Sequence, residues 1–430
     1  MTDPRYLAVK LLDKTFSSGS YSNLQLDSGL KGSDLDDRGR KLCSAIYYGV
    51  IERKLTLDHI IGGLSSRPIR KLDGIILNIL RCGVYQIMYM DSVPDNAAVN
   101  ESVALAKKFR KTSASGMVNA VLRNFIRSGK ELKLPKDAVK AASVKYSAPV
   151  ELVKSLADDY GGEAAENFLA ASLEKSVTFL RLNPNICSEE EFLAALGGIE
   201  AEKLFDCCYA VKSGDVTATE AFRKGFFHVQ GLASQLCCMS LAPTEEDTVL
   251  DICAAPGGKT FTMAELMGGK GEIYAFDLHE KRAELIRKGA ERLGLKNIKA
   301  AAGDATVFNS ELPKFTKILC DVPCSGLGVI GSKPEIKYKD ISDFAGLPDI
   351  QYKIVCNALN YLAEGGTLVY STCTVRKAEN EEVCERLLRE HPELEAVELP
   401  KLMGADFGTM ATLMPPKFGS GFFIAKFRKK

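Results

Sequence analysis

The chain has 430 residues, of which 46% are apolar and 26% charged, a composition typical of a soluble globular protein with two or three domains. It has no run of about 18 apolar residues to span a membrane and no secretory signal, so we expect a cytoplasmic protein without membrane contact. The net charge of +1 is uneven, because residues 1–128 carry 19 Lys/Arg and 12 Asp/Glu, a net of +7. This basic third is equally compatible with a polyanion-binding module and with a solvated surface.

The 13 cysteines and four histidines bear on metal and redox chemistry. A chain of this length without a secretory signal is expected to keep its cysteines as thiols. No CxxC pair is present to begin a tetrahedral metal site, so we expect no bound metal. Most of the cysteines should be small buried hydrophobic residues.

Residues 1–128 read as a helical domain. Apolar residues from Leu72 to Ile87 recur at the spacing of one buried helical face. Asp95-Asn96 is expected to cap the next helix, Ala97–Phe109, which ends in a tract of four positive charges. The same apolar pattern continues from Met117 to Phe125.

A polar stretch at 128–135 suggests a boundary, and residues 129–225 read as a small mixed α+β domain. Helices are expected near Val150–Tyr160 and Glu163–Leu173, followed by a strand at Val177–Asn183. Nothing in the sequence assigns this domain a role. No sign of oligomerisation is evident, so a monomer is expected.

Residues 226–430 alternate short β-rich runs with helical patterns, which predicts βαβ units, a parallel sheet and an α/β fold. The expected strands are Thr248–Cys253, Gly271–Leu278, Ile298–Gly303, Lys317–Val322 and Gly366–Thr372. Sheets of this type bind ligands beyond the carboxyl ends of their strands.

A glycine-containing turn follows the first of these strands, within Val249–Thr260. Small residues there allow the backbone to approach a nucleotide-like group. The turn fits neither GxGxxG nor the phosphate-binding GxxxxGK[ST] pattern, and a tight turn without a ligand remains an alternative. Asp277 ends the next strand, at a spacing suited to ribose hydroxyls, and Asp304 ends the third, where it could meet an adenine amino group.

Two cysteines each directly follow an expected strand. Cys324 lies in Asp321-Val322-Pro323-Cys324-Ser325-Gly326, and Cys373 lies in Tyr370-Ser371-Thr372-Cys373-Thr374. Both should therefore lie on the same edge as the nucleotide pocket, where a thiolate can act as a nucleophile. A lone cysteine is more often structural, but a pair on one edge favours chemistry. Cys320 is interpreted as a core residue.

These segments resemble the RNA 5-methylcytosine methyltransferases of the RsmB/Sun (Fmu) type, in the NOL1/NOP2/Sun family. The resemblance rests on three motifs, Asp251–Thr260, Asp321–Gly328 and Thr372–Cys373. Further similar stretches are Phe227–Gln230, Pro334–Tyr338 and Gly421–Ala425, and residues 1–128 resemble the NusB-like RNA-binding domain of that subgroup. Val322, Tyr338 and Thr374 depart from the usual residues, but none removes a reactive group.

The resemblance implies a Rossmann-like class I methyltransferase domain at 226–430 that uses S-adenosyl-L-methionine. The residues expected to bind this cofactor are Cys253, Ala254, Ala255, Pro256, Gly257, Gly258, Lys259, Asp277, Asp304 and Asp321. The expected substrate is an unstacked cytosine in 16S ribosomal RNA. Lys333, Lys337 and Lys339 are candidate phosphate contacts, with a solvated loop equally possible.

The resemblance also assigns the catalytic roles. Cys373 attacks C6 of cytosine so that C5 can accept a methyl group, Cys324 assists product release, and Asp321 holds the N3/N4 edge of the base. Lys259, between the cofactor turn and the substrate, is a further candidate contact to the base. Three alternatives stay open: the same chemistry on tRNA, a non-catalytic RNA-binding or ribosome-assembly factor, and reversed roles for the two cysteines.

Overall fold

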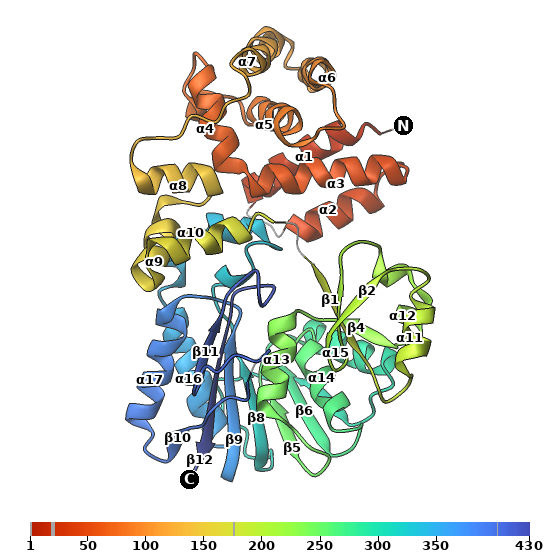
Figure 1. Ribbon diagram of the computed structural model, residues 1–430, viewed down its shortest axis with the longest axis vertical. Coiled ribbons are helices and arrows are strands. Elements are labelled where there is room, and N and C mark those ends of the chain that lie inside the picture. The colour runs from red at the N-terminus through yellow and green to blue at the C-terminus, as the bar shows by residue number, and fades with distance from the viewer. Residues whose placement is uncertain (1, 19–21, 175–176, 402) are drawn as a thin grey trace. The chain divides into compact units, whose positions relative to one another are not determined.

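The computed structural model describes residues 2–18, 22–174, 177–401 and 403–430. The chain divides into two compact units (Figure 1). The first comprises Met1–Leu173 together with Lys333–Lys339, and the second comprises Glu174–Ser332 together with Asp340–Lys430. The three-domain division predicted from sequence stays a prediction.

All regular structure in the described part of the first unit is helical. Its α-helices are α1 (Pro4–Ser18), α2 (Ser22–Lys31), α3 (Asp37–Glu52), α4 (Lys54–Leu64), α5 (Gly74–Tyr89), α6 (Asp95–Lys108), α7 (Ser115–Arg127), α8 (Ala138–Tyr146), α9 (Val150–Tyr160) and α10 (Gly162–Ala171). Short 3-10 turns are η1 (Ile69–Lys71), η2 (Thr112–Ala114) and η5 (Pro334–Tyr338). The expected apolar face forms the buried side of α5 in the core of this unit.

Two helix starts in this unit differ in how they are capped. Asp73 caps α5, because its carboxylate accepts hydrogen bonds from the backbone N–H groups of Ile75 and Ile76. The predicted cap at Asp95-Asn96 is wrong, since α6 begins at Asp95 itself. The residue before it is Pro94, whose fixed φ of −60° already suits a helix start, and it makes no side-chain capping bond.

The segment Lys333–Lys339, which we call the strap, belongs to the helical unit, although the residues before and after it in the sequence belong to the second unit. Ser22 donates its hydroxyl to the Glu335 carboxylate at 2.8 Å. Lys337 is only 2% exposed, and its Nζ donates to the backbone oxygen of Glu52 at 2.7 Å. The prediction that Lys337 contacts phosphate is therefore wrong, because its side-chain nitrogen is buried and hydrogen-bonded within the helical unit.

The second unit contains a small antiparallel sheet in the order β2-β3-β1-β4. Its strands are β1 (Thr178–Leu182), β2 (Ala201–Phe205), β3 (Cys208–Val211) and β4 (Phe227–Val229), accompanied by α11 (Glu189–Ala195), η3 (Val216–Ala218) and α12 (Glu220–Arg223). Phe192, Tyr209 and Phe227 form its aromatic core. β1 confirms the strand expected at Val177–Asn183.

The larger sheet has the order β10-β12-β9-β8-β5-β6-β7, with β11 paired to β12. Its strands are β5 (Thr248–Asp251), β6 (Glu272–Asp277), β7 (Ile298–Ala302), β8 (Phe315–Asp321), β9 (Leu362–Thr372), β10 (Leu394–Ala396), β11 (Met410–Leu413) and β12 (Phe422–Lys429). The five expected strands are confirmed as β5 to β9, which pair in parallel, whereas β12 runs antiparallel to β9.

Helices cover both faces of this sheet. They are α13 (Leu232–Leu241), α14 (Gly258–Leu266), α15 (Glu280–Arg292), α16 (Leu347–Leu359) and α17 (Glu381–Glu390), with 3-10 turns η4 (Leu327–Val329), η6 (Ile341–Phe344) and η7 (Lys377–Glu379). Consecutive strand residues point to opposite faces, so Val249 and Leu319 join one apolar core while Leu250 and Ile318 join the other. This two-sided burial fixes the strand register and therefore the positions of the strand ends.

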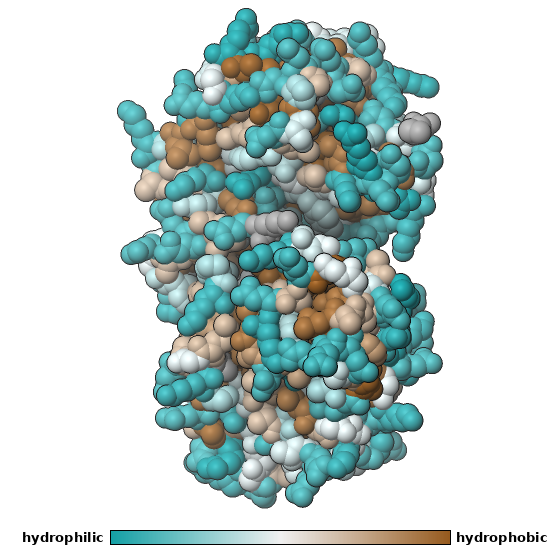
Figure 2. Space-filling model, turned by 45° about the vertical axis from the view of Figure 1, so that its right-hand side comes forward, coloured by the Kyte–Doolittle hydropathy of each residue, from teal (hydrophilic) through white to brown (hydrophobic). Residues whose placement is uncertain are grey.

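The visible face in Figure 2 is mostly hydrophilic, with hydrophobic side chains in separate small groups. None of the described helices combines the length and the apolar character needed to cross a bilayer.

Candidate active site

Polar residues gather at the carboxyl edge of the parallel sheet. β5 ends at Asp251, β6 at Asp277, β8 at Asp321 and β9 at Thr372. Because β5 to β9 are parallel, these ends and the loops that follow them lie along one edge. The predicted site residues therefore all lie at this edge, as the sequence indicated.

The glycine turn after β5 leads directly into α14. Gly257 has a φ of +109°, and a Cβ atom there would lie 2.4 Å from the Phe261 ring, so only glycine fits. The backbone of Ala254 donates to Phe276 O at 2.7 Å, which ties the turn to β6. No side chain caps the start of α14, so its first N–H groups are available to an anionic ligand.

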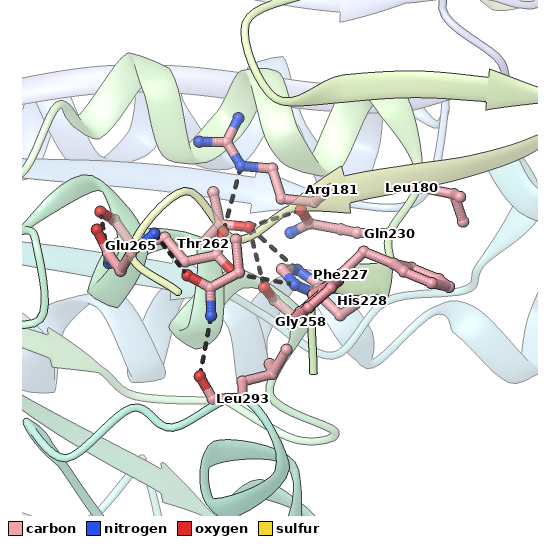
Figure 3. Close-up of polar contacts among 12 residues, drawn as sticks. Leu180, Arg181, Phe227, His228, Gln230, Gly258, Thr262, Glu265 and Leu293 are labelled. Carbon is pink, nitrogen blue, oxygen red and sulfur yellow. Dashed lines mark hydrogen bonds and ion pairs between the residues drawn. The ribbon is translucent and has the colours of Figure 1, made fainter. Parts of the chain in front are cut away.

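A buried polar network holds α14 against the small sheet. Figure 3 shows Arg181, Glu265, Thr262, Gln230 and His228 pointing toward one another. Arg181 Nε lies 3.3 Å from Glu265 Oε2, and His228 Nδ1 lies 3.2 Å from Glu265 Oε1. The Thr262 hydroxyl donates to Gln230 Oε1 at 2.6 Å. Because all five side chains are buried, the network fixes the helix that carries the glycine turn.

The two carboxylates expected to hold the nucleoside differ in environment. Asp277 is 4% exposed, and its Oδ2 lies 3.2 Å from Arg282, which also donates to Ala255 O at 2.7 Å. Arg282, which the sequence did not single out, thus links Asp277 to the glycine turn. Asp304 is exposed, and Oδ1 accepts bonds from the backbone and hydroxyl of Thr306, which hold the pKa of Asp304 below its usual value.

Asp321 is fixed from two sides. Lys259 Nζ lies 2.7 Å from Asp321 Oδ2, and the Ser371 hydroxyl donates to Oδ1 at 2.8 Å. Burial would lower the pKa of Lys259, but the Asp321 carboxylate outweighs this effect and the pKa is raised above its usual value. Lys259 is therefore a cation, and Asp321 is held in one orientation at the end of β8.

The two motif cysteines are brought together. Cys324 Sγ and Cys373 Sγ lie 3.3 Å apart, and both residues are half-buried and not joined by a disulfide. The hydrogen bond with Cys373, together with burial, raises the pKa of Cys324 well above its usual value. Cys324 therefore keeps its proton, and either sulfur can be the donor in the hydrogen bond between the two thiols. Cys320 is buried in the core, as predicted.

The sequence interpretation missed Glu379, Asn380 and Gln351, which are buried behind the cysteine loops. Glu379 and Asn380 stand immediately before α17, where polar residues usually serve as helix caps, so no signal marked them for the site.

Among the described residues, no group of three or more His, Cys, Asp and Glu side chains is placed to hold a metal ion.

Comparison with known proteins gives consistent matches. Residues 238–428 match the family model of the 16S rRNA methyltransferase RsmB/F, and residues 2–127 match the NusB family. The chain is 37% identical to a probable ribosomal RNA small subunit methyltransferase B of Bacillus subtilis, covering 100% of this chain and 99% of the relative. It is 31% identical to the ribosomal RNA small subunit methyltransferase B of Klebsiella pneumoniae, covering 99% of this chain and 98% of the relative.

Solved structures share the fold. The structure of PH0851 has a TM-score of 0.82 at 23% identity and covers 100% of this chain and 99% of its own. A methyltransferase homolog protein from Pyrococcus horikoshii has a TM-score of 0.59 at 26% identity, covering 69% of this chain and 100% of its own. The expected fold class, a NusB-like helical domain before a Rossmann-like methyltransferase domain, is confirmed.

Proposed function

Because the chain belongs to the ribosomal RNA small subunit methyltransferase B family, we propose that it methylates C5 of a cytosine in 16S ribosomal RNA, with S-adenosyl-L-methionine as the methyl donor. The observation that carries the cytosine chemistry is the pair of thiols 3.3 Å apart at the sheet edge. With two adjacent thiols, one sulfur can add to the cytosine ring, and the other can assist the departure of the first sulfur after methyl transfer.

The residues at the glycine turn fit the methyl donor. The uncapped start of α14 suits its carboxylate, and Asp277 at the end of β6 suits the ribose hydroxyls. Gly257 allows the turn to pack closely against Phe261, where a side chain would clash. S-adenosyl-L-methionine supplies an electrophilic methyl group on a sulfonium centre.

Cys373 and Asp321 act on the base. The sulfur of Cys373 adds to C6 of the cytosine, which turns C5 into an enamine-like carbon able to accept the methyl group. Asp321, held by Lys259 and Ser371, contacts the N3/N4 edge and favours cytosine over uracil.

The C5 proton passes to water, its bonding pair re-forms the C5=C6 double bond, and the Cys373–C6 bond breaks to release the product. The departing sulfur becomes a thiolate, and the protonated Cys324 thiol is positioned to donate a hydrogen bond to it. Because Cys373 must approach the face of the ring, the cytosine has to be unstacked. The exposed basic residues Lys107, Lys108 and Arg110 of the helical unit are candidates to hold the surrounding RNA backbone.

The test of this function is in vitro methylation of purified 16S ribosomal RNA and of tRNA with a labelled methyl donor, followed by mapping of the modified base. We expect 5-methylcytosine at a discrete position of the ribosomal RNA. Modification of tRNA alone would assign the same chemistry to the other substrate. Failure to bind S-adenosyl-L-methionine in calorimetry would instead favour a non-catalytic RNA-binding factor.

The variant Asp277→Asn is expected to weaken binding of S-adenosyl-L-methionine about 10- to 100-fold, the usual effect of losing hydrogen bonds to one charged group. The matched control is Glu272→Gln, at the opposite end of the same strand and exposed. Isothermal titration calorimetry measures both dissociation constants. Equal affinities for the two variants would remove Asp277 from the cofactor site.

A further inference from the structure

Glu379 joins the loop of Cys324 to the loop of Cys373. The carboxylate is fully buried, and Oε2 accepts hydrogen bonds from the backbone N–H of Ser325 at 2.8 Å and from Gln351 Nε2 at 3.1 Å. Gln351 Nε2 also donates to Pro323 O at 2.9 Å. Both chain neighbours of Cys324 are thereby held, one directly by Glu379 and the other through Gln351. The other oxygen, Oε1, accepts a bond from Arg376 at 3.1 Å.

Asn380 does the same for Cys373. It is fully buried, and its Oδ1 accepts the Thr372 hydroxyl at 2.6 Å while its Nδ2 donates to Thr374 O at 3.2 Å. Thr372 and Thr374 are the two chain neighbours of Cys373. The loops also contact each other directly, because the hydroxyls of Ser325 and Thr374 lie 2.8 Å apart.

The positions of Glu379 and Asn380 suggest helix capping, but the bonds point elsewhere. Asn380 precedes the first residue of α17, yet it makes no side-chain capping bond to that helix. Each side chain instead binds the loops that carry the thiols. A buried carboxylate is costly unless its oxygens are hydrogen-bonded, and here the bonds come from the catalytic loops and their supports.

We propose that Glu379 and Asn380 are a positioning pair that sets the separation of the two reactive sulfurs. Asn380 fixes Cys373 and Glu379 fixes Cys324. Because Glu379 and Asn380 are consecutive residues, the peptide bond that joins them keeps their relative position constant. This inference rests on the proposed function for its catalytic consequence. Shifts of about 1 Å in a reacting group can change rates roughly 10²-fold, so a rigid support is needed.

The proposal predicts opposite signatures for two isosteric variants. Glu379→Gln keeps the size of the side chain but loses the charge that holds Ser325 and Arg376, so Cys324 moves while Cys373 stays. We expect slow release and accumulation of a covalent protein–RNA adduct on denaturing gels. Asn380→Asp loses the donor to Thr374 O, so Cys373 moves, and we expect adduct formation itself to slow roughly 10²-fold. General destabilisation would not separate the two steps in this way.

Controls address folding and local charge. Glu382→Gln, exposed in the first turn of α17, removes a charge nearby and should behave as the wild type. Gln351→Met removes the support of Pro323 and one hydrogen bond to Glu379 Oε2, but it keeps the Glu379 carboxylate and its bonds to Ser325 and Arg376, so it should give a milder form of the Glu379→Gln signature. Circular dichroism establishes that each variant is folded. A folded Glu379→Gln variant with wild-type adduct levels and turnover would overturn the proposal.

A second measurement does not depend on methylation. Diamide takes two electrons and two protons from a pair of neighbouring thiols to form a disulfide. Peptide mapping by mass spectrometry should find a Cys324–Cys373 disulfide in the wild type, formed at least about tenfold more slowly in Glu379→Gln, because reaction of the two sulfurs requires their close approach. An unchanged rate in that variant would contradict the positioning role. If disulfide formation slows as expected while the wild type transfers no methyl group to ribosomal RNA or tRNA, the proposed function fails and the positioning role stands.

Discussion

The variant Cys373→Ala is expected to lose methylation by at least about 10⁴-fold, the scale of effect when an enzyme loses its nucleophile. Without the sulfur, C6 gains no substituent and C5 stays too weak a nucleophile for the methyl group. No covalent protein–RNA complex should form. Incorporation of labelled methyl groups measures the rate, and denaturing gels measure the adduct.

The matched control is Cys356→Ala, another half-buried cysteine, on α16. It should retain wild-type activity, and both variants should bind S-adenosyl-L-methionine with unchanged affinity. A Cys373→Ala protein that still forms an RNA adduct would assign the attack to Cys324 and reverse the roles of the two cysteines.

The variant Cys324→Ala is expected to trap the enzyme on its RNA. Cys373 can still attack, and the methyl group can still be transferred, but the departing sulfur lacks the hydrogen bond that Cys324 supplies across 3.3 Å. Loss of one donor to a developing anion typically slows a step by about 10²–10³-fold. The adduct should accumulate and survive denaturation, and multiple-turnover methylation should fall while the first turnover proceeds.

A stoichiometric adduct, quantified by gel shift with a labelled ribosomal RNA fragment, supports this role. Cys324→Ala with wild-type turnover and no accumulated adduct would show that the second thiol is dispensable. If the variant forms no adduct and also loses turnover, Cys324 would instead be needed before Cys373 attacks C6 of the cytosine.

β5, β8 and β9 could be predicted because most of their residues are buried, and β6 and β7 because they are β-rich runs bounded by turns. Their parallel direction followed from the βαβ pattern, and so Cys324 and Cys373, 49 residues apart, were correctly placed on one edge, whereas the strand order was not predicted. The family indicated by these motifs is confirmed by relatives at 31–37% identity. The two sulfurs lie close together because of the strand topology. The alternation of strand and helix segments in the sequence indicates the parallel direction of these strands.

Errors occurred where a residue's partners lie far away in sequence. Lys337 reads as an exposed loop lysine, yet its partner, the carbonyl of Glu52, is 285 residues distant. Glu379 and Asn380 immediately precede α17, so in the sequence they resemble residues at a helix start. Their bonds to the cysteine loops depend on how β8 and β9 pair, which the local sequence does not indicate. Hydrophobic periodicity indicates which face is buried, but it carries no information about which distant polar groups meet there.

The strap has a consequence for biosynthesis. Ser22, in α2, has its partner Glu335 in a segment that the ribosome makes more than three hundred residues later. The helical unit therefore cannot acquire its full set of contacts while it is the only part of the nascent chain outside the exit tunnel. Its maturation must wait until most of the second unit has been translated, and a fragment ending at Leu173 would lack the contacts made by Glu335 and Lys337.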